Sequence, residues 1–280
     1  PAHGSAIPRT ELDAGIRRVA LEAGATPMEG AKAVDVTFAG GRVDSELFDD
    51  GRSVRCRRLV VADGARSTLG RVLGREWHQD TAYGVAARGY VSSGRHDDPW
   101  ISSHLELRGE ADEVLAGYGW LFPLNDGRVN IGVGTLATDR RPANIKLRGL
   151  IDHYANARRA EWELGPEVEL VRSALLPMGG AVSGVAGPNW ALVGDAAGCV
   201  NPLNGEGIDY GLETGRMVAD LIAGLGPDAA GMSTAWPAIL REHYGEAFSI
   251  ARRLAGLVTV PWVLPRFGPA GMRSDLLMTL

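Results

Sequence analysis

Cysteine is scarce in this sequence of 280 residues, which contains only Cys56 and Cys199. Two cysteines so far apart exclude a disulfide framework and a zinc site built on cysteine pairs. We expect both to be small buried hydrophobic residues of a protein in a reducing, cytoplasmic environment. The histidines form no metal-binding spacing, and no GxSxG elbow is present. The sequence therefore predicts neither a metal site nor a hydrolase.

An excess of basic residues and a long hydrophobic run are missing as well. Lys and Arg number 29 against 34 Asp and Glu, a net charge of -5, which argues against a nucleic-acid partner. The longest apolar run, about residues 254–265, is too short to span a membrane and contains prolines. The sequence begins at Pro1 without an initiating Met, and no targeting pattern follows, so we expect the chain to be part of a longer protein.

Glycine, by contrast, is abundant, with 38 residues, about twice the usual share. In a helix expected over residues 207–223, Gly207, Gly211 and Gly215 recur every four residues, and alanines continue the spacing. This face carries almost no side chain, so the pattern predicts a sheet or a flat ligand packed close against it. The free amides at the start of such a helix favour an anionic group.

Two short apolar runs, residues 59–62 and 190–193, are typical of strands in a parallel sheet, covered on both faces. Each ends at an aspartate beside a glycine, and such pairs are also common in ordinary turns. Ligands of open α/β sheets bind beyond the carboxyl ends of strands, so we expect Asp63 and Asp195 to line one crevice. A helix over residues 11–23, capped by Thr10, is predicted before the first run.

Alternating strand patterns over residues 83–177 predict an antiparallel sheet, interrupted by a helix over about residues 144–161. We expect an α/β (α+β) chain organised in four segments. Residues 1–78 and 181–226 would form one α/β unit, and residues 79–180 an antiparallel sheet inserted into it. Residues 227–280 would form a helical region, with helices from about residue 236.

Tyr118, Trp120 and Phe122 share one face of a predicted hairpin in that sheet. A two-residue turn at Asp126-Gly127 would build an aromatic and aliphatic wall on this face and leave the other nearly bare. On this pattern alone, aromatic residues in a core are equally plausible. The expected pairs are Phe122 with Ile131, Trp120 with Val133, Tyr118 with Thr135, Gly119 with Gly134 and Leu121 with Gly132.

Three motifs resemble the flavin-binding motifs of glutathione-reductase-type flavoproteins: RxxLDxxI from Arg9, ADGARS from Ala62 and WALVGDAAGCVNPLNGEGI from Trp190. YGWLFP, followed by GVG, resembles the YxWxFP signature of the geranylgeranyl reductase family. The resemblance covers nearly the whole chain and implies FAD as the cofactor, in a fold of this type with the antiparallel sheet inserted. The implied FAD-binding residues are Arg9, Asp63, Gly64, Ala65, Gly194, Asp195, Pro202, Gly205, Glu206, Gly207 and Ile208.

The same resemblance implies a reductase that saturates an isolated C=C bond in the prenyl chain of menaquinone or of a geranylgeranyl lipid. Positive charge develops on carbon in this reaction, and aromatic faces stabilise it. Tyr118 is the candidate proton donor, and NAD(P)H or a protein would donate electrons. The apolar tail with basic ends, residues 252–266, is compatible with a core helix, with the wall of a tunnel for a prenyl chain, or with peripheral contact at the inner face of the membrane. The implied substrate residues are Tyr118, Trp120, Phe122, Pro123, Gly132 and Gly134.

One departure from the family pattern is the absence of a GxGxxG after a strand. We therefore expect an incomplete FAD-binding fold, without the first strand, turn and helix that hold the pyrophosphate. Two other functions share the flavin motifs. A flavin monooxygenase, hydroxylase or halogenase would need a pocket that activates oxygen, and a truncated, flavin-free module would bind without catalysis.

Overall fold

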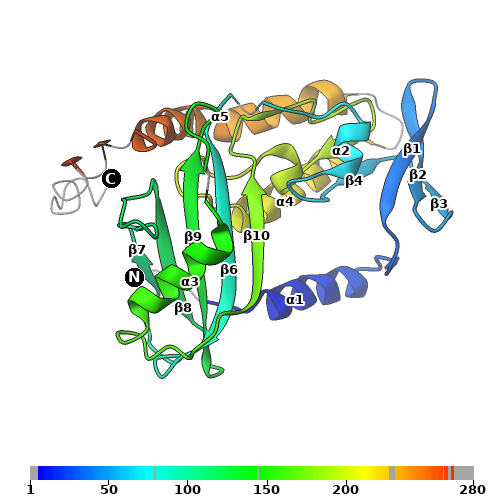
Figure 1. Ribbon diagram of the computed structural model, residues 1–280. Coiled ribbons are helices and arrows are strands. Elements are labelled where there is room, and N and C mark those ends of the chain that lie inside the picture. The colour runs from blue at the N-terminus through cyan, green and yellow to red at the C-terminus, as the bar shows by residue number, and fades with distance from the viewer. Residues whose placement is uncertain are drawn as a thin grey trace.

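The computed structural model describes residues 6–78, 80–143, 145–226, 231–260, 262–263 and 266–267. A large antiparallel sheet lies beside a smaller α/β unit (Figure 1). The helices are α1 (Arg9–Glu22), α2 (Thr68–Val72), α3 (Leu147–Arg158), the 3-10 helix η1 (Gly194–Ala197), α4 (Ile208–Leu225) and α5 (Met232–Val258). The strands are β1 (Ala33–Ala39), β2 (Arg42–Phe48), β3 (Ser53–Arg55), β4 (Leu59–Val61), β5 (Glu76–Trp77), β6 (Tyr83–Ser92), β7 (Ser102–His104), β8 (Gly117–Pro123), β9 (Arg128–Ala137), β10 (Glu169–Leu176), β11 (Val182–Ser183) and β12 (Trp190–Leu192).

The large sheet contains, in spatial order, β10, β6, β9, β8 and β7, and every neighbouring pair is antiparallel. One face is apolar and is covered by α3 (Figure 1). Ile131 and Val133 of β9 and Ile151 of α3 are fully buried there. The antiparallel sheet predicted over residues 83–177 is confirmed. Its covering helix is shorter than predicted, and residue 144, where the prediction began, lies outside the described residues.

The α/β unit is built around a parallel pair of strands, β4 and β12, in which Leu59 pairs with Trp190. This confirms the parallel arrangement of the two apolar runs. Burial on both faces is correct for β12 and wrong for β4, because Val60 is exposed. The antiparallel ribbon β1-β2-β3 and the helices α2, α4 and α5 complete the unit. Both strands end at the same edge, where Asp63 and η1 follow.

The register of the β8–β9 hairpin differs from the prediction by one residue. Leu124 N–H donates to the Arg128 carbonyl at 3.1 Å, which closes a three-residue loop instead of a two-residue turn. The loop needs left-handed backbone at two positions, and Asn125 and Gly127 supply it with φ of 59° and 88°. The observed pairs are Tyr118 with Gly134, Trp120 with Gly132, Gly119 with Val133, Leu121 with Ile131 and Phe122 with Asn130.

The shift in register reverses the character of the two hairpin faces. The aromatic face lies over glycines: a Cβ at Gly132 would be 2.0 Å from the Trp120 ring. The face predicted to be bare is the buried one, because Tyr154 of α3 packs on Gly119, where a Cβ would be 2.4 Å from its ring. The expected wall is therefore correct in its aromatic residues and wrong in its aliphatic ones, because Gly132 and Gly134 lie beside the rings.

Helix α1 begins two residues before its predicted start. Its N-cap is Pro8, whose carbonyl accepts from the N–H groups of Glu11 and Leu12, and the predicted cap Thr10 lies inside the helix. None of its residues is buried, and Ile16 and Val19 are exposed. The apolar residues of this helix therefore lie at a surface of the described structure.

Helix α4 confirms the prediction for residues 207–223 within two residues. Its glycine face packs near Asp195 at Gly207, but farther along the helix it is open among the described residues. A Cβ at Gly211 or Gly215 would meet nothing within 4 Å. Helix α5 is a single helix that starts earlier than expected and contains Pro237. The predicted helices at residues 268–280 lie outside the described residues.

Candidate functional site

A cleft of about 600 Å³ lies where the α/β unit meets the sheet. Its walls come from α1, from the ends of β4 and β12, from the start of α4, and from β6 and β10. The apolar side chains of Leu12 and Ile16 on α1 and of Ile208 and Leu212 on α4 all line this space. The volume is in the range of small-molecule and cofactor sites.

The two strand-end aspartates occupy different environments. The Asp63 carboxylate accepts from the Leu69 N–H at 3.0 Å, and the Ser67 hydroxyl accepts from the Gly70 N–H at 3.0 Å, so both stabilise the start of α2. Asp195 makes no such contact and lines the cleft. The segment that carries it is fixed to α4, because the Gly194 N–H donates to the Thr214 hydroxyl at 3.0 Å.

Electrostatics at Asp195 combine an unfavourable burial with two nearby cations. Burial raises the pKa of this carboxyl group, and the charges of Arg9 and Arg75 lower it in part. Arg9 lines the same cleft and also forms an ion pair with Asp13 at 3.0 Å. A carboxylate held in a partly desolvated cleft is suited to accept hydrogen bonds from the hydroxyl groups of a ligand.

Arg75 is a residue that sequence reasoning missed. Its side chain is only 7% exposed, and its Nε donates to the Ala196 carbonyl of η1 at 2.7 Å. The buried Nη2 has no hydrogen-bond partner, and burial lowers the pKa of Arg75 while Asp63 and Asp195 raise it. Arg75 thus places a positive charge between the two strand ends. No sequence signal identifies it, because its partner is 121 residues away.

The residues of the cleft suit the flavin part of the cofactor that the motifs predict. Along α4, the open Cβ positions of Gly211 and Gly215 leave a flat backbone surface, and a Cβ at Gly64 would also meet nothing within 4 Å. The N-cap residue Gly207 provides no side-chain hydrogen bond, so the first amides of this 18-residue helix remain free for an anion. A bulkier residue at Gly207 would approach the Asp195 carboxylate, 3.2 Å from an added Cβ.

A second cavity of about 510 Å³ lies on the face of the sheet opposite α3. We call it the chamber. Its walls are mainly apolar and come from β6, β8, β9, the residues around Leu176, the loop at residues 203–205 and Val258 at the end of α5. Trp120 lines it with its ring, and the indole N–H donates to the Asn130 side chain at 2.9 Å. The bare glycines of β9 make room for this ring.

The cleft and the chamber share a wall. Ala86, Trp120, Leu176 and Gly205 line both cavities. The loop that carries Gly205 is tied to the sheet because the Tyr118 hydroxyl donates to the Asn204 carbonyl at 2.8 Å. A ligand in the cleft and a ligand in the chamber would therefore meet at Trp120 and Gly205.

The predicted site residues divide between lining and supporting positions. In the cleft, Asp63, Ala65, Pro202 and Glu206 do not reach the lining, although they adjoin it in sequence. In the chamber, Phe122, Pro123 and Gly132 are not lining residues, and Gly132 lies beneath the Trp120 ring. The residues that line the cleft are Arg9, Gly64, Gly194, Asp195, Gly205, Gly207 and Ile208, and those that line the chamber are Tyr118, Trp120 and Gly134.

In the described part of the chain, no three His, Cys, Asp or Glu side chains come together as a metal site. Of the helices in that part, none has the length and apolarity needed to cross a bilayer.

Comparison with curated sequences gives clear relatives, although no family model matches the chain. The chain is 62% identical over 281 residues to a menaquinone reductase of Mycolicibacterium smegmatis. This alignment covers all of this chain and 68% of that protein. A menaquinone reductase of Mycobacterium tuberculosis is 58% identical over the same length and coverage. A digeranylgeranylglycerophospholipid reductase of Methanopyrus kandleri is 28% identical over 261 residues, 91% of this chain and 68% of that protein.

Solved structures share the fold. A geranylgeranyl bacteriochlorophyll reductase-like protein from Thermoplasma acidophilum superposes with a TM-score of 0.75 at 19% identity, over 90% of this chain and 64% of that chain. A flavin-dependent brominase superposes with a TM-score of 0.65 at 17% identity, over 98% and 68% of the two chains. These likenesses confirm the predicted fold class, a flavoprotein fold with an antiparallel sheet.

Proposed function

Because this chain belongs to the geranylgeranyl reductase family of flavoproteins, which includes the menaquinone reductases, we propose that it is an FAD-dependent reductase of prenyl chains. The reaction adds a hydride to one carbon of an isolated C=C bond and a proton to the other, which leaves a CH–CH unit. The substrate is the prenyl tail of menaquinone. Family membership by itself makes the chain an oxidoreductase.

The shared wall between the two cavities carries this proposal. FAD in its reduced form supplies the hydride equivalent. The cleft would hold it through Arg9, Asp195 and the free amides at the start of α4. The chamber would hold the alkene on the other side of Trp120 and Gly205. Hydride transfer to a carbon–carbon double bond needs such direct contact between cofactor and substrate.

The chamber has the chemistry of a prenyl site. Leu105, Leu176 and Met178 are among its lining side chains, and it contains no carboxylate, amine or imidazole in the described lining. Burial of prenyl CH2 groups there is worth about 0.8 kcal/mol each. The face of Trp120 would stabilise the positive charge that develops on carbon, by about 0.5–2 kcal/mol. Without a carboxylate, amine or imidazole in this lining, such a carbon meets no strong nucleophile among the described residues.

Tyr118 is the only ionisable side chain among the described residues of the chamber lining. Burial, and then the charge of Glu206, raise the pKa of Tyr118, so the hydroxyl stays protonated at neutral pH. We assign it two roles. Its hydrogen bond to the Asn204 carbonyl positions the 203–205 loop, and the same hydroxyl is our candidate proton donor to a substrate in the chamber. Donation to carbon would require this hydrogen bond to break.

The test uses the full-length protein loaded with FAD. After reduction by dithionite without oxygen, the protein is offered menaquinone, a geranylgeranyl phospholipid or geranylgeranyl diphosphate in separate reactions, and each product is weighed. We expect menaquinone to gain two hydrogen atoms in its tail and the other two lipids to react more slowly. A preference for the phospholipid would assign the geranylgeranyl phospholipid, and not menaquinone, as the substrate. An oxygenated product when air is admitted, with no saturation, would overturn the proposal in favour of a monooxygenase.

A further inference from the structure

Two arginines stand side by side on the sheet wall of the cleft. Arg88 of β6 and Arg172 of β10 both line this cavity and are partners in the antiparallel strand pair. We call them the arginine pair. Residues directly opposite each other point to the same face of a sheet, and like charges in these positions destabilise the strand pairing. Among the described residues, no carboxylate pairs with either of them: Arg88 lies over the Tyr90 ring, and Arg172 donates to a backbone carbonyl.

The carboxylates of the cleft interact with other cations. Asp13, which lines the cleft, forms its ion pair with Arg9 at 3.0 Å. Burial raises the pKa of the other lining carboxyl group, that of Asp195, and the cations that lower it are Arg9 and Arg75. The arginine pair is therefore an unmatched positive charge in the described part of a chain whose net charge is -5.

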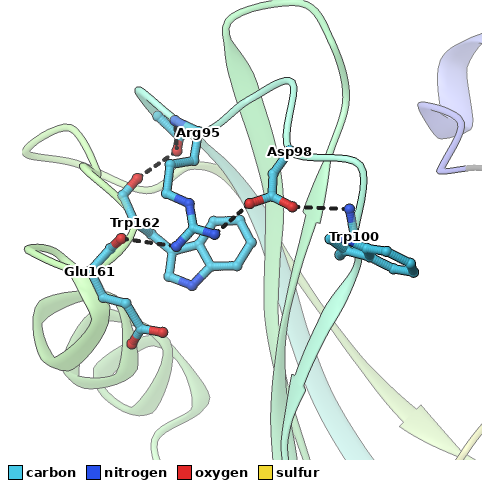
Figure 2. A network of polar contacts seen from close by, with 6 residues as sticks. Arg95, Asp98, Trp100, Glu161 and Trp162 are labelled. Atoms are coloured by element: carbon cyan, nitrogen blue, oxygen red, sulfur yellow. Dashed lines mark hydrogen bonds and ion pairs between the residues drawn. The ribbon is translucent and has the colours of Figure 1, made fainter.

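Arg95, in the loop after β6, shows how this sheet holds an arginine with a structural role (Figure 2). Its guanidinium group lies 4.5 Å from the centre of the Trp162 ring, donates to the Glu161 carbonyl at 3.2 Å and pairs with Asp98. The aromatic ring, the carbonyl and the carboxylate together satisfy its charge and fix its position. The arginine pair has no such network, so its charges are available to a ligand.

The position of the arginine pair relates it to the wall that the cleft and the chamber share. One row across the sheet contains, in order, Arg172, Arg88, Gly132 and Trp120. The Trp120 ring lies over Gly132, so β9 adds no side chain between Arg88 and this ring. Arg88 is two strand spacings, about 10 Å, from Trp120. A ligand with its anionic group at the arginine pair can therefore place another group at the shared wall.

The ligand chemistry that matches these features is a diphosphate ester. Each guanidinium group can bind phosphate oxygens bidentately, so two adjacent arginines suit two linked phosphates. A dinucleotide carries its diphosphate one sugar unit away from its redox-active ring, which fits the spacing between the arginine pair and the shared wall. The pair lines a cleft and not an open surface, so a small molecule fits it better than a protein does.

We propose that the arginine pair binds the diphosphate group of a dinucleotide. This inference rests on the proposed function, because it takes the cleft to be the site of FAD. Two dinucleotides share this chemistry, FAD itself and a nicotinamide dinucleotide that reduces it. The second is favoured, because Asp195 and the free amides of α4 lie on other walls of the cleft, and Arg172 is exposed on the edge strand β10.

A nicotinamide dinucleotide at this site would renew the reducing equivalents that the prenyl chain uses. Its dihydronicotinamide ring transfers a hydride to the oxidised flavin, a proton comes from solvent, and the nucleotide leaves in its oxidised form. The reductant would thus enter from the open side of the cleft, while the prenyl chain occupies the chamber beyond Trp120.

The experiment measures binding of NAD+ and NADP+ to the FAD-loaded, full-length protein by equilibrium dialysis. We expect at least one of them to bind, and Arg88→Gln and Arg172→Gln should each weaken this binding by about tenfold, with FAD affinity unchanged. Arg128→Gln is the matched control. Arg128 lies 5.2 Å from the centre of the Tyr90 ring, as Arg88 does, but it pairs with Asp126 and lines neither cavity.

Thermal unfolding separates a ligand site from a structural one. Because Arg172→Gln removes a like-charge contact, the flavin-free variant should unfold at the same temperature as wild type or at a higher one. A lower unfolding temperature would show that the pair holds the sheet together, and would contradict the charge repulsion from which the site is inferred.

Affinities distinguish the two sources of the diphosphate. Weaker FAD binding by both variants, with no nicotinamide dinucleotide bound by wild type, would confirm the site and assign it to FAD. Unchanged FAD affinity, with nicotinamide binding either absent or equal in all the proteins, would overturn the proposal. Tail reduction by wild type with dithionite as the reductant tests the proposed function separately, and its failure would refute that function while the dinucleotide result still stands.

Discussion

At the scale of single residues, Asp195 is where ligand binding and folding oppose each other. Burial raises the pKa of its carboxyl group above the unfolded value, so ionising it costs folding free energy at neutral pH. That cost disappears as the pH falls below the unfolded pKa. Asp195→Asn should therefore leave the flavin-free protein as stable as wild type, or more stable by at most about 1 kcal/mol, with no gain in acid. Thermal unfolding across pH measures this.

The same substitution should lower flavin occupancy at least tenfold, because it removes a charged hydrogen-bond acceptor from the cleft. Absorbance of the purified, full-length variant gives the occupancy. Unchanged occupancy would mean that Asp195 does not contact the cofactor.

Arg75 is predicted to act through Asp195. Its buried charge lowers the pKa of that carboxyl group, so Arg75→Met should raise the pKa and shift the acid limb of flavin binding upward by about one pH unit. Arg75→Lys keeps the charge and should restore most of the wild-type profile. The measurement is the flavin dissociation constant as a function of pH. Identical profiles in all three proteins would leave Arg75 with only a structural role.

Trp120 is predicted to act on the substrate side of the shared wall. Trp120→Leu keeps the chamber apolar but removes the aromatic face, so the rate of tail reduction should fall by roughly 2- to 30-fold, the equivalent of one cation-π contact. Flavin absorbance should remain. Rapid reduction kinetics of the flavin-loaded variant test this, and an unchanged rate would remove the ring from the mechanism.

At the scale of elements, the glycine face of α4 separates packing from ligand binding. Nothing among the described residues lies within 4 Å of an added Cβ at either Gly211 or Gly224. Leucine at each position should therefore raise the stability of the flavin-free protein by up to about 1 kcal/mol, because glycine is a poor helix former. Only Gly211→Leu should also reduce flavin affinity, since Gly211 lines the cleft and Gly224 does not. Equal flavin binding by both variants would contradict the placement of the flavin against the glycine face of α4.

The elements also show where sequence reasoning succeeds and where it stops. The strands β4 and β12 and the helix α4 follow directly from apolar runs and glycine spacing. The β8–β9 register does not, because Asp-Gly is compatible with a loop of two or three residues, and the choice moves Trp120 from opposite Val133 to opposite Gly132. Arg75 could not be predicted for a related reason, since only its tertiary contact with η1 places its charge at the site.

At the scale of the whole molecule, the arrangement of two cavities could not be predicted from motifs alone. The motifs name residues of the cleft and of the chamber separately, and seven of the predicted positions line neither cavity: Asp63, Ala65, Pro202, Glu206, Phe122, Pro123 and Gly132. What joins the two cavities is the Tyr118–Asn204 hydrogen bond between a strand of the sheet and a loop of the α/β unit. The exposed stripe of α1 likewise has meaning only as a wall of the cleft.

The most direct test of the account is a single turnover without oxygen. Reduced, FAD-loaded, full-length protein is mixed with menaquinone, flavin oxidation is followed by absorbance, and the product is weighed after its quinol head group has been reoxidised. We predict one tail-saturated molecule, heavier by two hydrogen atoms, for each flavin oxidised. Flavin oxidation without any retained mass gain would show that electrons reach only the quinone ring, and would contradict the claim that cleft and chamber serve reduction of a prenyl C=C bond.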